Sequence, residues 1–395
     1  MSIPVRTLPF DHPGPLEPCP EYAELRTGTP VAPVMTPDGR RAWLVTSYDA
    51  VAAVLSDARF GMAPPGATSA GNHTLFQDGE AHARLRRLVS KAFTPRRIAT
   101  LRPRVEELAV EYTAALAAAG PPADLIAGLA APLPLRVIGE LLGVTIDGSE
   151  RFRELADTAS SADFSAAGDS AEVAAATRAW HDLTLYAADL VAGKRRSPGD
   201  DLLSGLITVR DGDDGRLSDD ELVGMSTTIV AAGYLTTRNA IGVGTIQLIA
   251  EGRLARLADA PEELEGVVEE LLRHQSGLTA EPFPRWAHED LELAGVAIRA
   301  GDPVLVRLEA ANRDPRHFPE PDRFLPGRQG SSPHLGFGRG PHHCLGAALA
   351  RIELRAAFRA VARQLPGLRL GVPVDRLVWA RGQNDAGPTE VSVTW

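Results

Sequence analysis

The chain has 395 residues, of which 44% are hydrophobic and 23% charged, and its formal net charge is −10. This composition is typical of a globular protein with a large core, and its acidity argues against nucleic acid as a partner. No apolar run is long enough to predict a transmembrane helix, and the N-terminal residues lack the apolar core of a signal peptide. We therefore expect a cytoplasmic protein that does not bind membranes.

The organisation of the chain is uniform, because no linker, charge block or internal repeat divides it. We expect a single domain over residues 1–395, with a proline-rich and mostly irregular lead over residues 1–30. A strand is predicted at residues 42–46 and a helix at 47–55. A long loop, of the kind that often covers a binding site, is predicted at residues 61–72.

A basic segment follows this loop. Within it, His82 and Arg86 are spaced i and i+4 and so share one helix face. Such a segment is usually a solvated basic face, but we expect Arg86 to point inward. The basic residues expected to face solvent are Arg84, Arg87, Lys91, Arg96 and Arg97.

The longest predicted helix begins at a capping box, Ser218-Asp-Asp-Glu221, and no proline follows until Pro261. It should span about residues 219–250 and, being apolar on all sides, run through the core. At its middle lies Ala232-Gly-Tyr-Leu-Thr-Thr237. A threonine in such a position often only bonds to a carbonyl one turn earlier.

A second helix is expected after Pro261, a favoured first helical residue, and it carries Glu270 and Arg273 on one face. Such a pair has little weight alone, because similar pairs occur on most solvated helices.

Strand character is confined to two short regions. Residues 291–298 and 304–308 predict one small sheet that turns at Gly295 and Gly301, and residues 378–379 and 391–394 predict a late pair. The sequence thus predicts a mainly α protein with small β-sheets.

The most informative segment is Phe337-Gly-Arg-Gly-Pro-His-His-Cys-Leu-Gly346, a glycine-rich loop before a helix predicted at residues 345–365. It places Cys344 near a helix N-terminus, where the dipole favours the thiolate that ligates metals. With only one other cysteine, Cys19, which we expect to be an incidental free thiol, the chain cannot form a four-cysteine metal site.

Three other interpretations of this loop fit less well. Cys344 could be a small buried apolar residue. A zinc site would combine it with His334, His342 and His343, but adjacent ligands fit tetrahedral geometry poorly. A dinucleotide loop would need glycine where Pro341 stands, and no βαβ unit surrounds it.

The pattern Phe-Gly-x-Gly-x-His-x-Cys-x-Gly resembles the haem-binding loop of the cytochrome P450 family, with every fixed position matched. The resemblance extends over about residues 40–395 and implies a mainly α, single-domain P450-like fold. It implies haem b whose iron is ligated by the Cys344 thiolate, which favours O–O cleavage. It also implies that Phe337 packs near the sulfur, that His342 bonds a haem propionate, and that Gly346 completes the cofactor-binding loop.

The segment around Gly233 resembles the family's oxygen-binding motif. The resemblance gives Gly233 the role of making room for dioxygen, and Thr236 the role of steering proton delivery. Leu235 stands where the family has a carboxylate that relays protons. Either water or a polar group of the substrate then supplies protons, or peroxide is the oxidant, or one-electron oxidation couples substrate radicals without oxygen insertion.

Further motifs match the family in order. Glu270 and Arg273 resemble its Glu-x-x-Arg pair, with Arg323 as the expected third member of the network and Arg328 as the alternative. The residues that the resemblance assigns to the haem propionates besides His342 are His82, Arg86 and Arg285.

Partners and substrate are implied only through the resemblance. Together with Arg339 and Arg351, the basic residues of the segment that follows the predicted loop at 61–72 would form a patch that binds an acidic ferredoxin. That ferredoxin would be reduced by a ferredoxin reductase, because no flavin or nicotinamide fold is seen in this chain. The expected substrate contacts are Tyr234, Phe283, Gln383 and Asn384, and the polar side chains of Gln383 and Asn384 suggest a hydrogen-bonding substrate.

The predicted function is that of a P450 monooxygenase that oxidises a small molecule in specialised metabolism, by hydroxylation in the default case. Oxidative C–C or C–N coupling is the alternative that Leu235 raises. Alternatives of another class are a non-catalytic haem-based sensor, although no output domain is seen, and a non-haem metal-binding protein.

Overall fold

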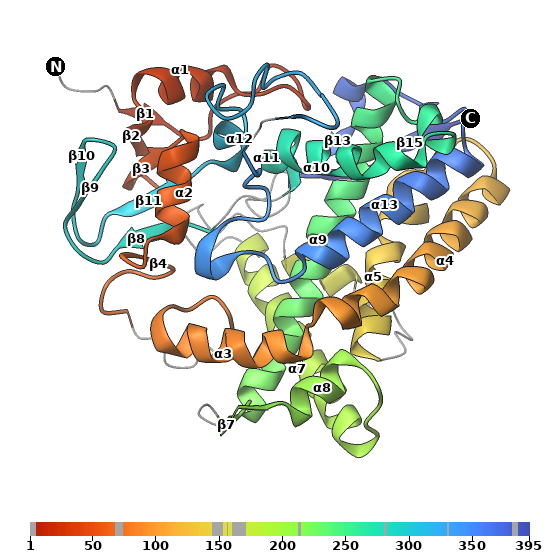
Figure 1. Ribbon diagram of the computed structural model, residues 1–395, viewed down its shortest axis with the longest axis horizontal. Helices are drawn as coiled ribbons and strands as arrows, with labels where there is room; N and C mark the ends of the chain where they lie inside the picture. The colour runs from red at the N-terminus through yellow and green to blue at the C-terminus, as the bar shows by residue number, and fades with distance from the viewer. Residues whose placement is uncertain are drawn as a thin grey trace. The chain divides into compact units, whose positions relative to one another are not determined.

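The computed structural model describes residues 5–67, 74–143, 153–155, 157–159, 171–211, 215–279, 283–329, 332–380 and 386–395 (Figure 1). These residues form two compact units that alternate along the chain. Of the described residues, the first unit contains 5–67 and 265–344, and the second contains 74–264 and 345–395. The predicted loop at 61–72 lies partly outside the described residues.

The first unit is built around a six-stranded sheet with the strand order β1-β2-β3-β11-β8-β4. Its strands are β1 (Arg6–Thr7), β2 (Val31–Met35), β3 (Arg41–Val45), β11 (Pro303–Val306), β8 (Arg285–Ala287) and β4 (Phe60–Gly61). Strand β3 confirms the strand predicted at 42–46, one residue earlier. Its neighbour β11 runs parallel to it, and Val304 and Val306 are buried there.

This pairing corrects the predicted sheet over residues 291–308. Strands β9 (Leu291–Leu293) and β10 (Val296–Ile298) pair only with each other, around a turn in which Gly295 has a φ of +80°. Strand β11 does not pair with β9 or β10. It pairs with β3, which lies far away in the sequence, because its apolar side chains are buried there.

The helices of the first unit are α1 (Pro20–Gly28), α2 (Tyr48–Ser56), α10 (Leu264–His274, whose first residue belongs to the second unit), α11 (Ser276–Thr279) and α12 (Leu308–Ala311). Helix α2 confirms the predicted helix, with Ser47 as N-cap. Helix α1 lies in the lead that was expected to be mostly irregular. Pro20 is its first residue, and Tyr22 and Leu25 are buried, so the proline starts the helix instead of preventing it.

The second unit is mainly helical. Its longer helices are α3 (Gly79–Ala92), α4 (Pro95–Ala119), α5 (Pro132–Leu142), α7 (Ala171–Arg196), α8 (Leu202–Thr208), α9 (Asp219–Ala250) and α13 (Ala347–Gln364). Short helical turns are η1 (Ile126–Ala130), η2 (Ala255–Ala258), η3 (Pro261–Glu263) and η5 (Val374–Arg376).

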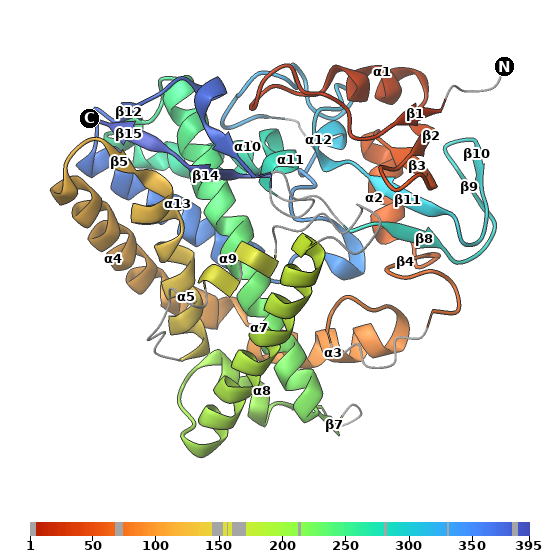
Figure 2. The ribbon, with the colours of Figure 1, turned by 180° about the vertical axis from the view of Figure 1, so that it is seen from behind.

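Helix α9 is the central element of this unit. Both bonds of the predicted capping box between Ser218 and Glu221 form, and the helix ends at Ala250 as expected. It packs against α5, α7 and α13, as both views of the ribbon show (Figures 1 and 2). The prediction that this helix runs through a core is confirmed for the second unit, since most of its side chains are buried.

The small sheets of the second unit correct the predicted late pair. Strand β13 (Val378–Trp379) pairs with β14 (Pro388–Glu390), whereas β15 (Ser392–Thr394) lies between β12 (Arg369–Leu370) and β5 (Ala123–Asp124). Val393 of β15 is fully buried, whereas Val378 of β13 is 60% exposed. The two strands therefore belong to different sheets, one buried and one near the surface. The remaining strands, β6 (Arg210–Asp211) and β7 (Gly215–Arg216), form a ribbon.

Among the residues placed in the structure, no helix is long and apolar enough to cross a membrane.

Candidate functional site

The cysteine loop belongs to the first unit and is shaped by hydrogen bonds within its own backbone. The amide of Cys344 donates to the carbonyl of Phe337 at 2.9 Å, and the amide of Gly338 donates to that of Leu335 at 2.8 Å. A short helical turn, η4 (Gly340–His342), lies between them. The loop thereby folds back on itself and brings Cys344 beside the start of the motif.

Glycine is required in this loop at Gly340. Its φ is +71°, and a Cβ there would lie 2.5 Å from the carbonyl oxygen of Leu55 in α2. The loop backbone therefore lies directly against the end of α2, where no other side chain fits.

The two cysteines differ in availability. The thiol of Cys344 is exposed, two residues before Gly346, which is the N-cap of α13. Cys19 is buried, and burial together with a hydrogen bond to Glu21 raises the pKa of its thiol to about 12. Cys344 is thus the cysteine that can reach an external metal centre.

The aromatic residue of the motif lies between two histidines. The ring centroid of Phe337 is 6.0 Å from that of His334 and 6.4 Å from that of His343. In the part of the chain that the structure describes, no group of three or more His, Cys, Asp or Glu side chains could hold a metal ion. The zinc interpretation is therefore left without a ligand set there.

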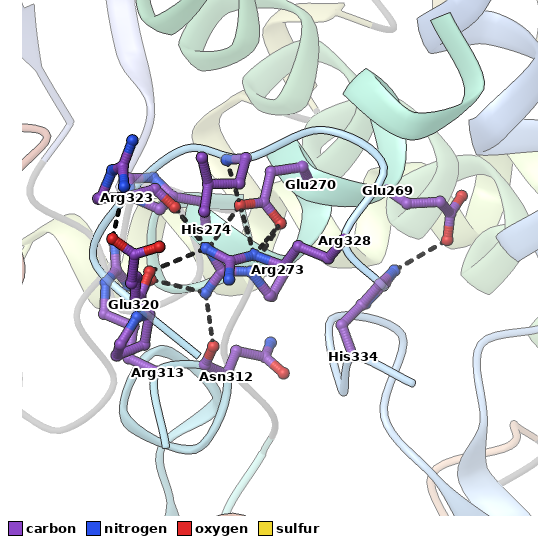
Figure 3. Close-up of polar contacts among 12 residues, drawn as sticks. Glu269, Glu270, Arg273, His274, Asn312, Arg313, Glu320, Arg323, Arg328 and His334 are labelled. Atoms are coloured by element: carbon purple, nitrogen blue, oxygen red, sulfur yellow. Dashed lines mark hydrogen bonds and ion pairs between the residues drawn. The ribbon is translucent and has the colours of Figure 1, made fainter. Parts of the chain in front are cut away.

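The Glu-x-x-Arg pair forms a buried network in the first unit (Figure 3). Arg273 donates to both carboxylate oxygens of Glu270 at 2.8 Å, and to the carbonyls of Asn312 and Pro321. Glu270 also accepts the amide of Leu325 at 2.7 Å. Burial by itself would raise the pKa of Glu270, but the bonds and charge of Arg273 and its other donors hold it below its ordinary value.

The third cation of this network is Arg328, not Arg323. The Nε atom of Arg328 lies 2.9 Å from Glu270, whereas the guanidinium of Arg323 is 65% exposed and pairs with Glu320 (Figure 3). Arg323 contributes its backbone carbonyl, which accepts from Arg328 at 2.6 Å. Arg323 is drawn outward because Glu320 lies three residues before it.

Arg285 and Phe283 lie near each other in the first unit. Arg285 is 6% exposed in β8, and its guanidinium donates to the carbonyl of Phe283 at 2.7 Å. The side chain of Phe283 is 46% exposed.

The oxygen-motif residues belong to α9 in the second unit. The hydroxyl of Thr236 donates to the carbonyl of Ala232 at 2.7 Å, the bond to the preceding turn that a helix threonine often makes. A Cβ on Gly233 would lie 3.1 Å from Ile138 in α5, so this glycine also permits close helix packing. Leu235 is buried at 5% exposure and brings no titratable group to this segment.

Tyr234 lies on another side of helix α9 than Ala232. Two residues along a helix correspond to about 200° of rotation, so Tyr234 lies on the side opposite to Ala232. Tyr234 is fully buried, and burial, followed by the nearby charge of Asp157, raises the pKa of its phenol. Asp157 also pairs with Arg238 at 3.0 Å. The role of Tyr234 as a substrate contact stays a prediction.

The expected propionate ligands of the second unit both lie on α3. His82 is buried at 4% exposure and Arg86 is half-buried. Arg84, expected to be solvated, is instead half-buried and pairs with Glu221 of α9. Gln383 and Asn384, two of the expected substrate contacts, lie outside the described residues.

One pair in the site was missed by sequence reasoning. His334 bonds Glu269, the residue next to Glu270, at 3.1 Å (Figure 3). The only sequence signal was a histidine three residues before Phe337, which was considered as a zinc ligand and not as a structural partner.

The donor set of the first unit fits an anionic cofactor that contains a metal. It consists of the exposed thiol of Cys344 on a tight loop and the buried guanidinium of Arg285. A thiolate suits iron, and guanidinium groups suit carboxylates.

Comparison with known proteins agrees with this donor set. A family model described as "Cytochrome P450" matches residues 262–364. The chain is 42% identical to the mycinamicin IV hydroxylase/epoxidase of Micromonospora griseorubida, over 99% of this chain and 98% of that protein. It is 40% identical to the nocardicin C N-oxygenase of Nocardia uniformis subsp. tsuyamanensis, with the same coverage.

Solved structures of similar proteins indicate the same family. The LnmA cytochrome P450 hydroxylase from the leinamycin biosynthetic pathway of Streptomyces atroolivaceus S-140 superposes with a TM-score of 0.88 at 40% identity, covering 99% of this chain and 100% of that one. The cofactor is accordingly a haem with thiolate-ligated iron, and the fold is the mainly α P450 fold with small sheets. The chain therefore belongs to the cytochrome P450 family and is an oxidoreductase of its monooxygenase type.

Proposed function

We propose that this enzyme hydroxylates a small molecule of specialised metabolism and that Cys344 provides the thiolate ligand of the haem. The observation that carries the proposal is the exposed thiol of Cys344 on a loop that Gly340 holds against α2, while Cys19 is buried. When bound, the haem supplies the redox centre for dioxygen activation, and thiolate ligation favours O–O cleavage. Phe337 and Gly346 complete this loop, and residues 1–395 act as one catalytic domain.

Binding of the cofactor's carboxylates falls to cationic and imidazole side chains. We assign this task to His82, Arg86, Arg285 and His342. Arg285 is held by its bond to the Phe283 carbonyl, which fixes its guanidinium before any ligand arrives. Charge-assisted bonds of this kind are stronger than neutral ones, so each should contribute to cofactor retention.

The direct test is substitution of the proposed ligand. Cys344→Ser should abolish the band of the reduced carbon monoxide complex that gives the family its name, while Cys19→Ser should leave it unchanged. Retention of that band in Cys344→Ser would show that another residue ligates the iron.

Oxygen insertion is the favoured outcome. The relatives named above are a hydroxylase/epoxidase and an N-oxygenase, and both names describe oxygen transfer to the substrate. Thr236 would accept a hydrogen bond near Gly233 and so position the proton source, water or a polar group of the substrate, because Leu235 carries no proton. Candidate compounds that shift the spin state of the haem should be converted under isotopically labelled dioxygen, and the label should appear in the product.

A second candidate function is oxidative coupling without oxygen insertion. The observation that favours it is Leu235, an apolar and buried side chain where the family has an acid. Leu235→Glu separates the two candidates. If coupling to reduced cofactor consumption, product profile and rate all stay unchanged, the missing acid is irrelevant to the reaction.

Electrons would come from an external ferredoxin and its reductase. On the second unit Arg87, Lys91 and Arg96 are exposed, and they offer a basic surface on an acidic protein. Such a surface attracts acidic partners in a salt-dependent manner. Arg87→Glu should slow reduction by an acidic ferredoxin at low salt more than at high salt, whereas a salt-independent rate would argue against this contact.

A further inference from the structure

The cysteine loop is tied to α10 by one histidine. The Nε2 atom of His334 lies 3.1 Å from an oxygen of Glu269, and its Nδ1 atom accepts the amide of Gly336 at 3.0 Å. Since Nδ1 accepts, Nε2 carries the proton and donates to the carboxylate. The His334 side chain is only 9% exposed, so solvent competes little for these bonds.

The segment that His334 holds lies against the backbone of α10. A Cβ on Gly336 would come within 2.6 Å of the Leu272 carbonyl oxygen and 3.0 Å of His334 Nδ1. The loop is therefore pressed between the imidazole and the helix, at a position where only glycine fits. If the imidazole of His334 moved, Gly336 would still contact the Leu272 carbonyl but would lose its contact with His334.

The same segment leads directly to the cysteine. Phe337 follows Gly336, its carbonyl accepts the Cys344 amide, and its ring lies beside the His334 ring. His334 thus controls two features of Phe337, the direction of the carbonyl that holds Cys344 and the position of the ring.

Neighbouring contacts fix the backbone around His334 but not Gly336 itself. The amide of Leu335 donates to the side chain of Asn312 at 2.7 Å, and the hydroxyl of Tyr48 donates to the carbonyl of Pro333 at 2.7 Å. Asn312 is in turn held by Arg273. Glu269 and Glu270, adjacent on α10, therefore serve two different anchors, one for the cysteine loop and one for the arginine network (Figure 3).

We propose that His334 and Glu269 form a positioning pair that keeps Phe337 in register with Cys344 and thereby retains the thiolate ligand on the iron. The inference rests on the proposed role of Cys344. Neither residue touches the reacting atoms, and both act through Gly336 and Phe337. Partners that orient metal ligands in this way typically change metal affinity by about 10–100-fold when removed.

The test uses the full-length haem-containing enzyme and its reduced carbon monoxide spectrum. His334→Ala should speed conversion from the thiolate-ligated to the thiolate-free form by about tenfold, the lower end of that range. His334→Asn, whose carboxamide oxygen can still accept the Gly336 amide, should recover part of this loss. Glu265→Ala, an exposed change on the same helix, is the matched control and should behave like the unmodified enzyme.

Hydrogen exchange at the Phe337 and Cys344 amides gives a second readout. Exchange there should rise in His334→Ala and not in Glu265→Ala. Unchanged spectra and unchanged exchange in His334→Ala would overturn the proposal. If that variant does not accumulate as folded protein, Glu269→Ala, which keeps the imidazole, decides in the same way: faster thiolate loss supports the pair and unchanged behaviour rejects it.

Failure of this inference can be told apart from failure of the proposed function. If Cys344→Ser keeps the thiolate band, the assignment of Cys344 is wrong whatever His334 does. If Cys344→Ser loses the band while both His334 and Glu269 variants keep theirs, the ligand is right and the positioning pair is wrong.

Discussion

Two buried glutamates, one in each unit, show opposite solutions to the same physical problem. Glu270 in α10 is 4% exposed and Glu353 in α13 is 3% exposed. Glu270 receives two guanidinium groups and a backbone amide, and its pKa falls. Among the residues that the structure describes, Glu353 Oε2 has no hydrogen-bond partner, and burial raises the pKa of this group well above its ordinary value.

The comparison teaches that donors, not depth, decide whether a buried carboxyl is a charge. Removing a carboxylate from water costs several kcal/mol, and only close cations and amides offset that cost. The surroundings of Glu270 therefore favour its anion, whereas burial favours the neutral form of Glu353.

The largest effect is expected from Glu270→Ala. This change leaves Arg273 and Arg328 buried without their carboxylate, which typically costs about 3–5 kcal/mol. The free energy of unfolding should drop by that amount, and haem-containing protein should be hard to recover. A loss below about 1 kcal/mol would mean that Glu270 does not organise the arginines.

Low pH should destabilise the same region through protonation of His274. Burial, followed by the charge of Arg313, lowers the pKa of this imidazole from 6.5 to about 4. A group with a depressed folded-state pKa gives stability that is present above the unfolded value and lost as the pH falls through the folded value. This shift corresponds to roughly 3 kcal/mol.

The measurement is denaturant unfolding between about pH 7 and pH 4. His274→Gln should flatten the acid loss of stability compared with the unmodified protein. An identical pH profile in both proteins would contradict the assignment, and His288→Gln, in which an exposed imidazole is changed, serves as the control.

Glu353 should respond in the opposite direction to Glu270. Glu353→Met replaces an unpaired polar group by an apolar one of similar length, so stability should stay constant or rise by about 1–2 kcal/mol. Because the folded-state pKa of Glu353 is raised, its contribution is present at low pH and is lost as the pH rises through that value. Unfolding measured at increasing pH should therefore distinguish the two proteins, and a marked loss of stability in Glu353→Met would contradict the contrast drawn between the two glutamates.

The smallest effect is expected where the ionisable partner of a buried carboxylate is itself partly exposed to solvent. Glu309 accepts from His12 at 3.2 Å and from the Cys19 amide, and the hydrogen bond that His12 donates to Glu309 raises the pKa of His12. Stability from this pair is present below pH 6.5 and is lost as the pH rises through the raised value. His12 is 38% exposed, so the effect should stay below about 1 kcal/mol.

Hydrogen exchange in residues 5–19 reports this last pair. Protection should fall as the pH rises, after correction for the intrinsic exchange rate, and His12→Gln should remove the dependence. The titratable and charged neighbours of the imidazole are Glu309, Arg313 and Glu21, and Glu21→Gln should change the profile less than Glu309→Gln.

Local signals in the sequence were sufficient for α9 and α2. A capping box and a long stretch without proline set the bounds of α9, and Ser47 marked the start of α2. Pairing of strands was not predictable, because the partners of β11 and β15 lie far away in the sequence and are selected by burial.

For the candidate site, motif positions were predictable but side-chain directions were not. Arg323 and Arg328 are both arginines in one irregular segment, and only the fold shows that Glu320 draws Arg323 outward. Tyr234 lies within the oxygen motif in sequence, yet it is fully buried and helix geometry turns it away from Ala232.

The bond from Thr236 to Ala232 sets a polarity along α9. With its only proton given to a carbonyl one turn earlier, the hydroxyl presents lone pairs to whatever approaches it. Threonine in this state receives a hydrogen bond and does not give one. A water molecule, an alcohol or an amine brought beside it would thus be oriented with its proton toward the helix, so the guest, and not the protein, determines where the next proton comes from.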